Sequence, residues 1–263
     1  MLADLAARLL APLVRWQVRQ VRHRSAQLPE AQGHREGVSG IGRVRLRVLI
    51  VGDSSAAGVG ASTQAQALSG RLGEALSQRL EGSVVWQVVA RRGDTTADSV
   101  EALKRLALRP ADVMVTTVGL TDLIDRVSTT RWLRSLDRLD RIAARRAGVR
   151  HVVHCGLPPV QSYPLPQPMR WVLALGQRRY NAALARWVAA QGPDRTWLPI
   201  PFENEPGSDS VLMAGDGLHP GPAVYALWAE QLAQEISAAI VPFLPDTTPT
   251  RALPAPDARR RPR

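Results

Sequence analysis

Residues 45–58 read RLRVLIVGDSSAAG, a run rich in branched apolar residues that ends in a block of small and polar ones. Such an apolar run is typical of a buried strand, and the glycine, aspartate and serine come directly where that strand ends. In α/β proteins, ligand sites form at the carboxyl ends of parallel strands. The stretch therefore predicts an α/β fold and one corner of a functional site.

Similar short apolar runs alternate with longer segments of helical period along the chain. We expect strands at Arg45–Val51, Val84–Val89, Val113–Val118, His151–His154 and Thr196–Leu198. Helices are predicted over Gln64–Leu80, Ala97–Leu106, Thr130–Arg146, Arg170–Ala190 and Pro222–Ile240. This alternation indicates βαβ units, so we expect a three-layer α/β/α sandwich around a five-stranded parallel sheet.

The 263 residues, 45% hydrophobic and 22% charged, suit one large domain with short extensions. We expect a basic, partly helical arm over 1–43, the α/β domain over 44–241, and a Pro- and Arg-rich tail over 242–263 that is disordered. Met1 to Arg47 carries +6 of the net charge of +11 and Asp246 to Arg263 carries +3, which leaves the residues between them, Val48 to Pro245, nearly neutral at +2. Nucleic-acid binding is therefore not expected, although the total charge first suggests it.

Composition excludes further classes of protein. Lys104 is the only lysine among 34 basic residues, which is typical of a compositional bias rather than of phosphate contacts. No stretch approaches the roughly 20 apolar residues that cross a bilayer. The single cysteine, Cys155, excludes a disulfide framework within the chain and a multi-cysteine metal site. Because it lies among apolar neighbours at the end of a predicted strand, we expect it to be unreactive.

The basic arm has two interpretations. It carries leucines at helical spacing followed by arginines: Leu2, Leu5, Leu9, Leu13, Arg19, Arg22 and Arg24. The helix either packs its leucines on the body of the protein or lies on an anionic membrane surface, where each arginine adds about 1 kcal/mol. The arm lacks the pattern of a secretory signal. We therefore expect a cytoplasmic location, with peripheral attachment to a membrane as the alternative.

Three interpretations compete for the loop after the first strand. A phosphate cradle needs a Lys-Ser/Thr pair after its second glycine, and no lysine is present. A dinucleotide turn needs three glycines directly after the strand, whereas Gly58 and Gly60 come late and a third is lacking. A nucleophilic serine, Ser54, remains. A Gly-Asp-Ser triplet alone is weak evidence for it.

A second motif supplies a base for that serine. Asp216 and His219 stand three residues apart, immediately before the last predicted helix. A serine attacks only when a base takes its proton, and the base needs an acceptor to orient it. Ser54, His219 and Asp216 provide such a set. His151 and His154 fall in a predicted strand, where structural roles are expected.

Two further strand ends offer glycine-containing loops for an oxyanion: Gly93 after the second strand, and Gly119-Leu120-Thr121-Asp122 after the third. Together with Gly52-Asp53-Ser54 before them and Asp216 to His219 after them, these loops make four short motifs, each at the end of a predicted strand or before the last helix. The chain thereby resembles the SGNH, or GDSL, hydrolase family. The resemblance implies a flavodoxin-like strand order and the activity of a serine esterase or lipase that needs no metal and no cofactor.

By this resemblance, Ser54 is the nucleophile, His219 the base and Asp216 its orienting acid. The backbone N–H groups of Ser54 and Gly93 would donate to the oxyanion. The family's third donor is an asparagine side chain, and Thr121 stands in its place. A hydroxyl can donate one hydrogen bond, and losing a donor typically costs on the order of 10²- to 10³-fold in rate. Asp53 and Asp122 are expected to hold loops through backbone hydrogen bonds.

The expected partner is a small-molecule ester with a small to medium acyl chain. The stiff, largely apolar segment Gly156–Pro166 either only covers the sheet edge or forms a wall for the acyl group. Arg91 and Arg92, beside Gly93, either favour an anionic substrate or are solvated surface. Two alternatives stay open: removal of O-acetyl groups from a carbohydrate, and a non-catalytic module that binds acylated ligands at a membrane surface.

Overall fold

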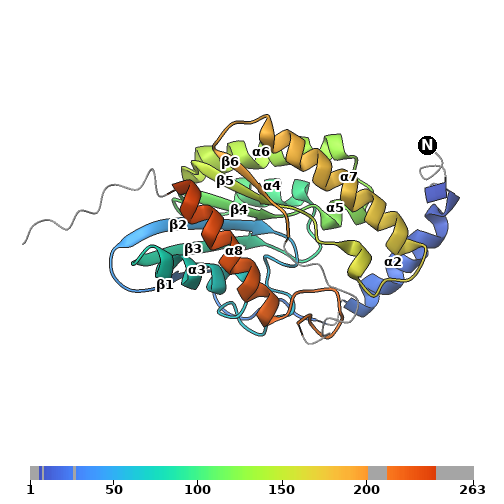
Figure 1. Ribbon diagram of the computed structural model, residues 1–263, viewed down its shortest axis with the longest axis horizontal. Coiled ribbons are helices and arrows are strands. Elements are labelled where there is room, and N and C mark those ends of the chain that lie inside the picture. The colour runs from blue at the N-terminus through green and yellow to red at the C-terminus, as the bar shows by residue number, and fades with distance from the viewer. Residues whose placement is uncertain (1–5, 8, 26–27, 201–211, 241–263) are drawn as a thin grey trace, which may run out of the picture.

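The computed structural model describes residues 6–7, 9–25, 28–200 and 212–240, and the predicted tail lies outside them. The described chain forms an α/β/α sandwich around a sheet of six strands (Figure 1). The strands are β1 (Glu36–Ser39), β2 (Val44–Gly52), β3 (Ser83–Ala90), β4 (Val113–Thr117), β5 (His151–Cys155) and β6 (Arg195–Leu198). Their order across the sheet is β1-β3-β2-β4-β5-β6.

The prediction of a five-stranded, all-parallel sheet is wrong in one strand. β2 to β6 pair in parallel and in the flavodoxin-like order, but β1 pairs antiparallel with β3 at the edge. β1 reads only EGVS, without a branched run, so periodicity gives no sign of it. Gly37 lets this edge approach closely, since a Cβ there would lie 2.5 Å from the ring of Trp86. β1 therefore forms from a segment that composition placed in the basic arm.

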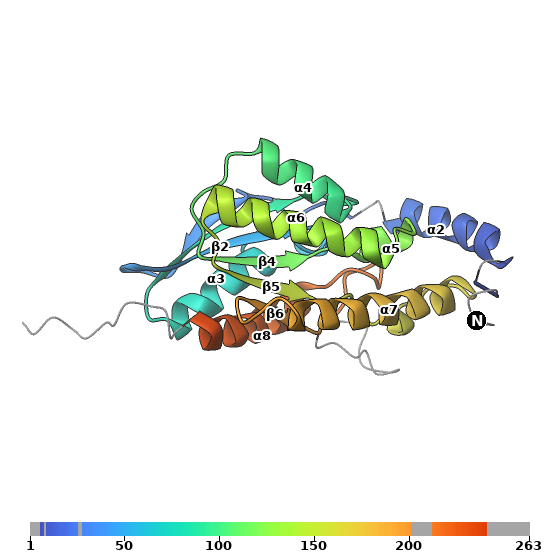
Figure 2. The ribbon, with the colours of Figure 1, turned by 90° about the horizontal axis from the view of Figure 1, so that it is seen from above.

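The helices cover both faces of the sheet (Figure 2). Along the chain they are α2 (Ala11–Ser25), α3 (Leu68–Arg79), α4 (Thr96–Arg105), α5 (Leu120–Ile124), α6 (Thr129–Ala147), α7 (Met169–Ala189) and α8 (Pro222–Ile240), with a short 3-10 turn at Val160–Ser162. α3 packs against α8 and α4 against α6. The predicted helix at Gln64 begins only at Leu68, because the Gln64 side chain instead donates to the carbonyls of Ala31 and Ala57.

The core lies on both sides of a sheet whose central strand is deeply buried. Leu49, Ile50 and Val51 of β2 have no exposed surface. Ile50 joins the cluster under α3 and α8, while Leu49 and Val51 join the cluster under α4 and α6. Because successive side chains point to opposite faces, one apolar run supplies both layers. This burial fixes the position at which the chain leaves the sheet, at Gly52.

Of the two interpretations of the arm, packing of its leucines on the body of the protein is wrong for Leu9 and Leu13, which are 73% and 44% exposed. Leu2 and Leu5 lie outside the described residues. Val14 is buried instead, with Leu10, Val18 and Val21 packed in the same cluster. No described helix combines the length and the apolar character needed to span a bilayer.

Candidate active site

The loops that follow β2, β3 and β4 meet the loop before α8 at the carboxyl edge of the sheet. They surround a cavity of about 440 Å³ whose lining includes Ser54, Gly93, Thr121 and His219. Asp216, the fifth predicted site residue, is bonded to His219. The structure thus brings together residues that lie far apart in the sequence.

The Asp216–His219 pair is the most tightly bonded part of this site. His219 Nδ1 lies 2.6 Å from Asp216 Oδ2, and the backbone N–H groups of Leu218 and His219 donate to Asp216 Oδ1 at 2.9 and 3.0 Å. Burial alone would raise the pKa of Asp216, but these hydrogen bonds outweigh it and lower the pKa to about 2. Asp216 is therefore an ionised acceptor that holds the imidazole by Nδ1 and leaves Nε2 for other chemistry.

Ser54 begins a tight turn that is fastened to the last helix. The N–H of Val59 donates to the Ser54 carbonyl at 3.0 Å, and the Tyr225 hydroxyl of α8 donates to the Val59 carbonyl at 2.7 Å. Gly52 is required before the turn, since a Cβ there would lie 2.3 Å from Thr117 Oγ1. Within the described chain, Ser54 Oγ makes no hydrogen bond to His219, although both line the cavity. Such contacts are often long until substrate is bound.

Two residues that line this cavity, Ser54 and Gly93, have backbone N–H groups without a partner among the described residues. Gly93 has a φ of +79°, and nothing lies within 4 Å of the place where its Cβ would be. A left-handed backbone in open space is the conformation for which glycine is favoured. Both N–H groups are therefore available as donors to a ligand in the cavity.

Thr121 is engaged in a different contact from the one that the sequence suggested. Its hydroxyl donates to Asp53 Oδ2 at 3.2 Å. Burial raises the pKa of Asp53 to about 6, although the Ser55 N–H and the Thr121 hydroxyl both favour its ionised form. A hydroxyl has one proton, so Thr121 can donate elsewhere only by releasing Asp53.

Asp122 holds a loop, as expected. Its Oδ2 accepts the N–H and the hydroxyl of Thr96 at 2.9 and 2.8 Å. Thr96 opens helix α4, directly after the Gly93 loop. Asp122 therefore ties the loop after β4 to the loop after β3, and both loops contribute to the cavity.

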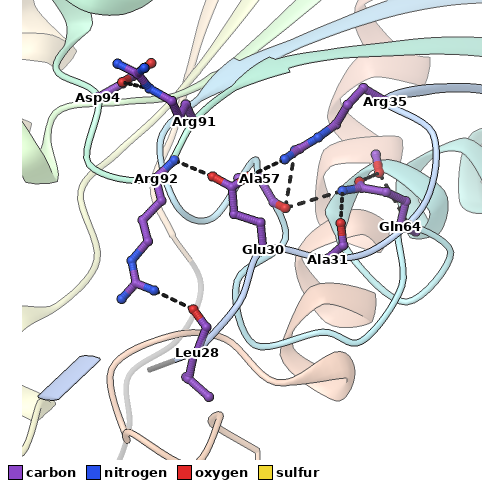
Figure 3. Close-up of polar contacts among 10 residues, drawn as sticks. Leu28, Glu30, Ala31, Arg35, Ala57, Gln64, Arg91, Arg92 and Asp94 are labelled. Carbon is purple, nitrogen blue, oxygen red and sulfur yellow. Dashed lines mark hydrogen bonds and ion pairs between the residues drawn. The ribbon is translucent and has the colours of Figure 1, made fainter. Parts of the chain in front are cut away.

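Sequence reasoning missed Glu30, which supports the Gly93 loop from the N-terminal segment (Figure 3). Glu30 Oε1 accepts the N–H of Arg92 at 2.7 Å, and Oε2 accepts from Arg35 at 2.5 Å. Arg35 in turn donates to the carbonyl of Ala57 in the Ser54 turn at 3.3 Å. One carboxylate therefore links the two loops that carry the free N–H donors. No motif could reveal it, because Glu30 stands 62 residues before Arg92.

The two arginines beside Gly93 differ in their surroundings. Arg91 is exposed and pairs with Asp94 at 2.8 Å, while the guanidinium of Arg92 donates to the carbonyl of Leu28 (Figure 3). Only Arg92 lines the cavity. Arg91 is therefore part of the solvated surface. Of the two arginines, only Arg92 is placed to contact a substrate.

The other histidines in the body of the protein have structural partners. His154 is fully buried in β5 and lies 2.9 Å from Thr116 Oγ1 and 3.3 Å from Asp140 Oδ2. His151 lies 3.1 Å from the Thr196 hydroxyl. Neither lines the cavity, as their position in a strand predicted.

The walls of the cavity are mostly apolar. The segment Gly156–Pro166 forms one wall through Leu157, Val160, Tyr163 and Leu165. Val18 and Val21 of α2, which sequence analysis did not place here, also line the cavity. Apolar walls with a few convergent polar groups are typical of small-molecule sites.

Comparison with known proteins gives the same family as the motifs. The sequence model of the GDSL-like lipase/acylhydrolase family matches residues 50–227. No curated protein shows significant similarity to the chain.

Solved structures share the fold at low sequence identity. The lipase Lip_vut3 from a goat rumen metagenome is 19% identical with a TM-score of 0.55, over 74% of this chain and 97% of that one. TesA is 22% identical with a TM-score of 0.52, over 75% and 99%. The psychrotrophic esterase EstA from Pseudoalteromonas sp. is 15% identical with a TM-score of 0.51, over 74% and 98%. Since the family match covers more than half of the chain, from the end of β2 to the start of α8, this chain belongs to the GDSL-like lipase/acylhydrolase family.

Proposed function

We propose that this protein is a serine hydrolase that cleaves carboxylic esters through an acyl-enzyme on Ser54. The observation that carries this proposal is the 2.6 Å contact between His219 Nδ1 and Asp216, with His219 and Ser54 on the wall of one largely apolar cavity. A base oriented by a carboxylate next to a serine is the arrangement that activates a hydroxyl for acyl transfer.

The proposed reaction gives each of these groups one role. Ser54 Oγ attacks the ester carbonyl carbon while its proton passes to His219 Nε2, and Asp216 stabilises the resulting imidazolium. The carbonyl oxygen becomes an oxyanion, to which the N–H groups of Ser54 and Gly93 donate. The alcohol leaves with the proton from Nε2. Water then attacks the acyl-enzyme by the same path and releases the carboxylic acid and free Ser54.

Thr121 enters this scheme as the third donor. In the free enzyme its proton goes to Asp53. When Asp53 is protonated, its carboxyl can donate to the Thr121 oxygen, and the hydroxyl proton is then free to turn toward the oxyanion. The pKa of Asp53, about 6, lies close enough to neutrality for both arrangements to be populated.

The walls favour an acyl group over a sugar. A carbohydrate O-acetylesterase needs polar partners for the sugar hydroxyls, and the walls of this cavity are instead formed mostly by apolar side chains such as Leu157, Val160 and Met169. We therefore place the apolar part of the ester in this cavity.

The test is a series of p-nitrophenyl esters of increasing acyl length, with wild type and Ser54→Ala, alongside labelling by a fluorophosphonate. We expect turnover and labelling by wild type and neither by Ser54→Ala. Turnover that survives the substitution would refute the assignment of the nucleophile. Absence of both turnover and labelling in wild type would favour the module that only binds acylated ligands.

A further inference from the structure

Helix α2 forms a wall of the catalytic cavity although it precedes the region shared with the family, which begins at residue 50. Two contacts hold it there. The Gln17 side chain donates to the Gln167 carbonyl at 2.7 Å and accepts the Met169 N–H at 3.1 Å, at the start of α7. Arg22 pairs with Asp125, at the end of α5, at 2.5 Å. α2 is thus a built part of the site.

A second cavity, of about 610 Å³, lies between α2, α5 and α7. It adjoins the catalytic cavity, because Val18, Arg22, Ile124, Asp125 and Leu173 line both. Figure 2 shows α2 beside these two helices. A ligand bound at Ser54 can therefore extend from the first cavity into the second, beneath α2.

The two cavities differ in charge. The second has an apolar floor, but five arginines also line it: Arg15, Arg19, Arg22, Arg126 and Arg179. Asp125 is the only carboxylate among its described lining residues. Within the described chain, neither Arg15 nor Arg19 is paired with an acidic group, and both are exposed. A cleft lined by one sign of charge raises the local concentration of the opposite ion.

We propose that the ester taken by this enzyme carries an anionic group of the phosphate class. The acyl part lies in the cavity at Ser54, and the alcohol part passes Val18 to place its anion among the arginines of the second cavity. Guanidinium groups are well suited to phosphate because they offer several donors at a fixed geometry. This inference rests on the proposed function for the position of the ester bond.

The experiment compares two esters of equal chain length, a 1-hexanoylglycerol and its 3-phosphate, below the concentration at which either aggregates. The variant Arg15→Gln/Arg19→Gln removes two of the charges. The control Arg131→Gln/Arg134→Gln removes two exposed arginines of α6 that line neither cavity. Both variants change the net charge equally.

We expect wild type to prefer the phosphate ester. The Arg15→Gln/Arg19→Gln variant should lose up to about fivefold in kcat/KM for each arginine, mainly through KM, on this ester alone. The neutral ester and the control variant should be unaffected. Equal kcat/KM of wild type on both esters, or an equal loss on both in the variant, would overturn the inference.

A binding measurement separates this inference from the catalytic one. Calorimetry of the phosphate ester with Ser54→Ala needs no turnover, and the affinity should fall when Arg15 and Arg19 are also replaced. If wild type turned over neither ester while this difference in affinity remained, the proposed function would fail and the anion site would stand. If wild type turned over the esters but replacement of Arg15 and Arg19 left the affinity unchanged, the proposed function would stand and the anion site would fail.

A second inference concerns the outer face of α2. Leu9, just before the helix, and Leu13 and Trp16 within it are exposed, with Trp16 at 58%. They lie at helical spacing on one face, with Arg15 and Arg19 at its side. Apolar and cationic side chains in this arrangement suit the interface of an anionic bilayer. We infer that α2 docks on such a surface, which would place the opening beneath α2 next to lipid.

Pelleting with vesicles tests this inference directly. Wild type should pellet with vesicles that contain phosphatidylserine and not with pure phosphatidylcholine, and Leu13→Ser/Trp16→Ser should abolish the difference. The exposed pair Leu106→Ser/Leu227→Ser, outside α2, is the matched control and should pellet like wild type. Pelleting that is unchanged in Leu13→Ser/Trp16→Ser, or absent in wild type, would remove the inference.

Discussion

Replacement of Asp53 by asparagine should stabilise the protein, and the gain should depend on pH. Asp53 is 5% exposed and has a pKa of about 6 in the folded chain, against 3.8 for an unburied group, because burial penalises its charge. Below pH 3.8 the group is protonated in both states and folding bears no penalty. Between 3.8 and 6 the penalty grows, and above 6 it is complete.

The size of the penalty follows from the difference in pKa. About two units at 1.36 kcal/mol each correspond to ~3 kcal/mol of lost stability above pH 7. An asparagine side chain at this position cannot ionise, has nearly the same volume, and offers a carbonyl that can accept from the Thr121 hydroxyl. The free energy of unfolding of Asp53→Asn should therefore exceed that of wild type by ~3 kcal/mol at about pH 8 and by less than ~1 kcal/mol at about pH 4.

Urea unfolding of both proteins across this pH range measures the difference. Asp216→Asn is the control, because its expected effect on the free energy of unfolding has the opposite sign. Since the pKa of Asp216 is lowered to about 2, its charge stabilises the fold above the unfolded pKa, and the substitution should destabilise the protein at neutral pH. A gain in Asp53→Asn that is the same at every pH would refute the reasoning, because ionisation would then not be its cause.

Three further predictions concern single residues. Thr121→Val should lower kcat on the order of 10²-fold while Thr121→Asn retains or raises it, and equal kcat for wild type and Thr121→Val would show that the hydroxyl takes no part. Glu30→Ala should lower kcat with little change in KM, because the Arg92 N–H beside Gly93 loses its acceptor. Glu30→Gln should restore most of the rate. A change confined to KM would contradict a positioning role for Glu30. Cys155 is buried, which raises its pKa to about 12, so a thiol reagent should modify it only in urea, and rapid reaction of the native protein would contradict this burial.

Local pattern predicted those parts of the fold that bury a continuous apolar surface. All five predicted strands, β2 to β6, were found within one residue of their observed bounds, and α8 at its observed bounds. β1 escaped because its sequence, EGVS, contains a single apolar side chain, whereas β6, an edge strand of the same length, reads RTWL and was predicted. α5 escaped as well, since its five residues amount to little more than one turn.

The candidate site likewise contains residues that local motifs predict and contacts that only the folded chain creates. Ser54, Gly93 and the Asp216–His219 pair stand on local motifs, so sequence alone could name them. The bond from Thr121 to Asp53 and the link from Glu30 to Arg92 join segments 68 and 62 residues apart, and no spacing rule describes them. The arginines around the second cavity come from three elements, α2, the end of α5 and α7, so their gathering depends on tertiary packing.

The bond from Tyr225 in α8 to the Ser54 turn has a consequence for biosynthesis. The serine leaves the ribosome early, but its imidazole partner and the helix that clamps the turn are among the last parts of the domain to be made. If Ser54 and His219 act together as proposed, a nascent or truncated polypeptide carries the hydroxyl without its base. Hydrolytic competence should therefore arise only with completion of the fold.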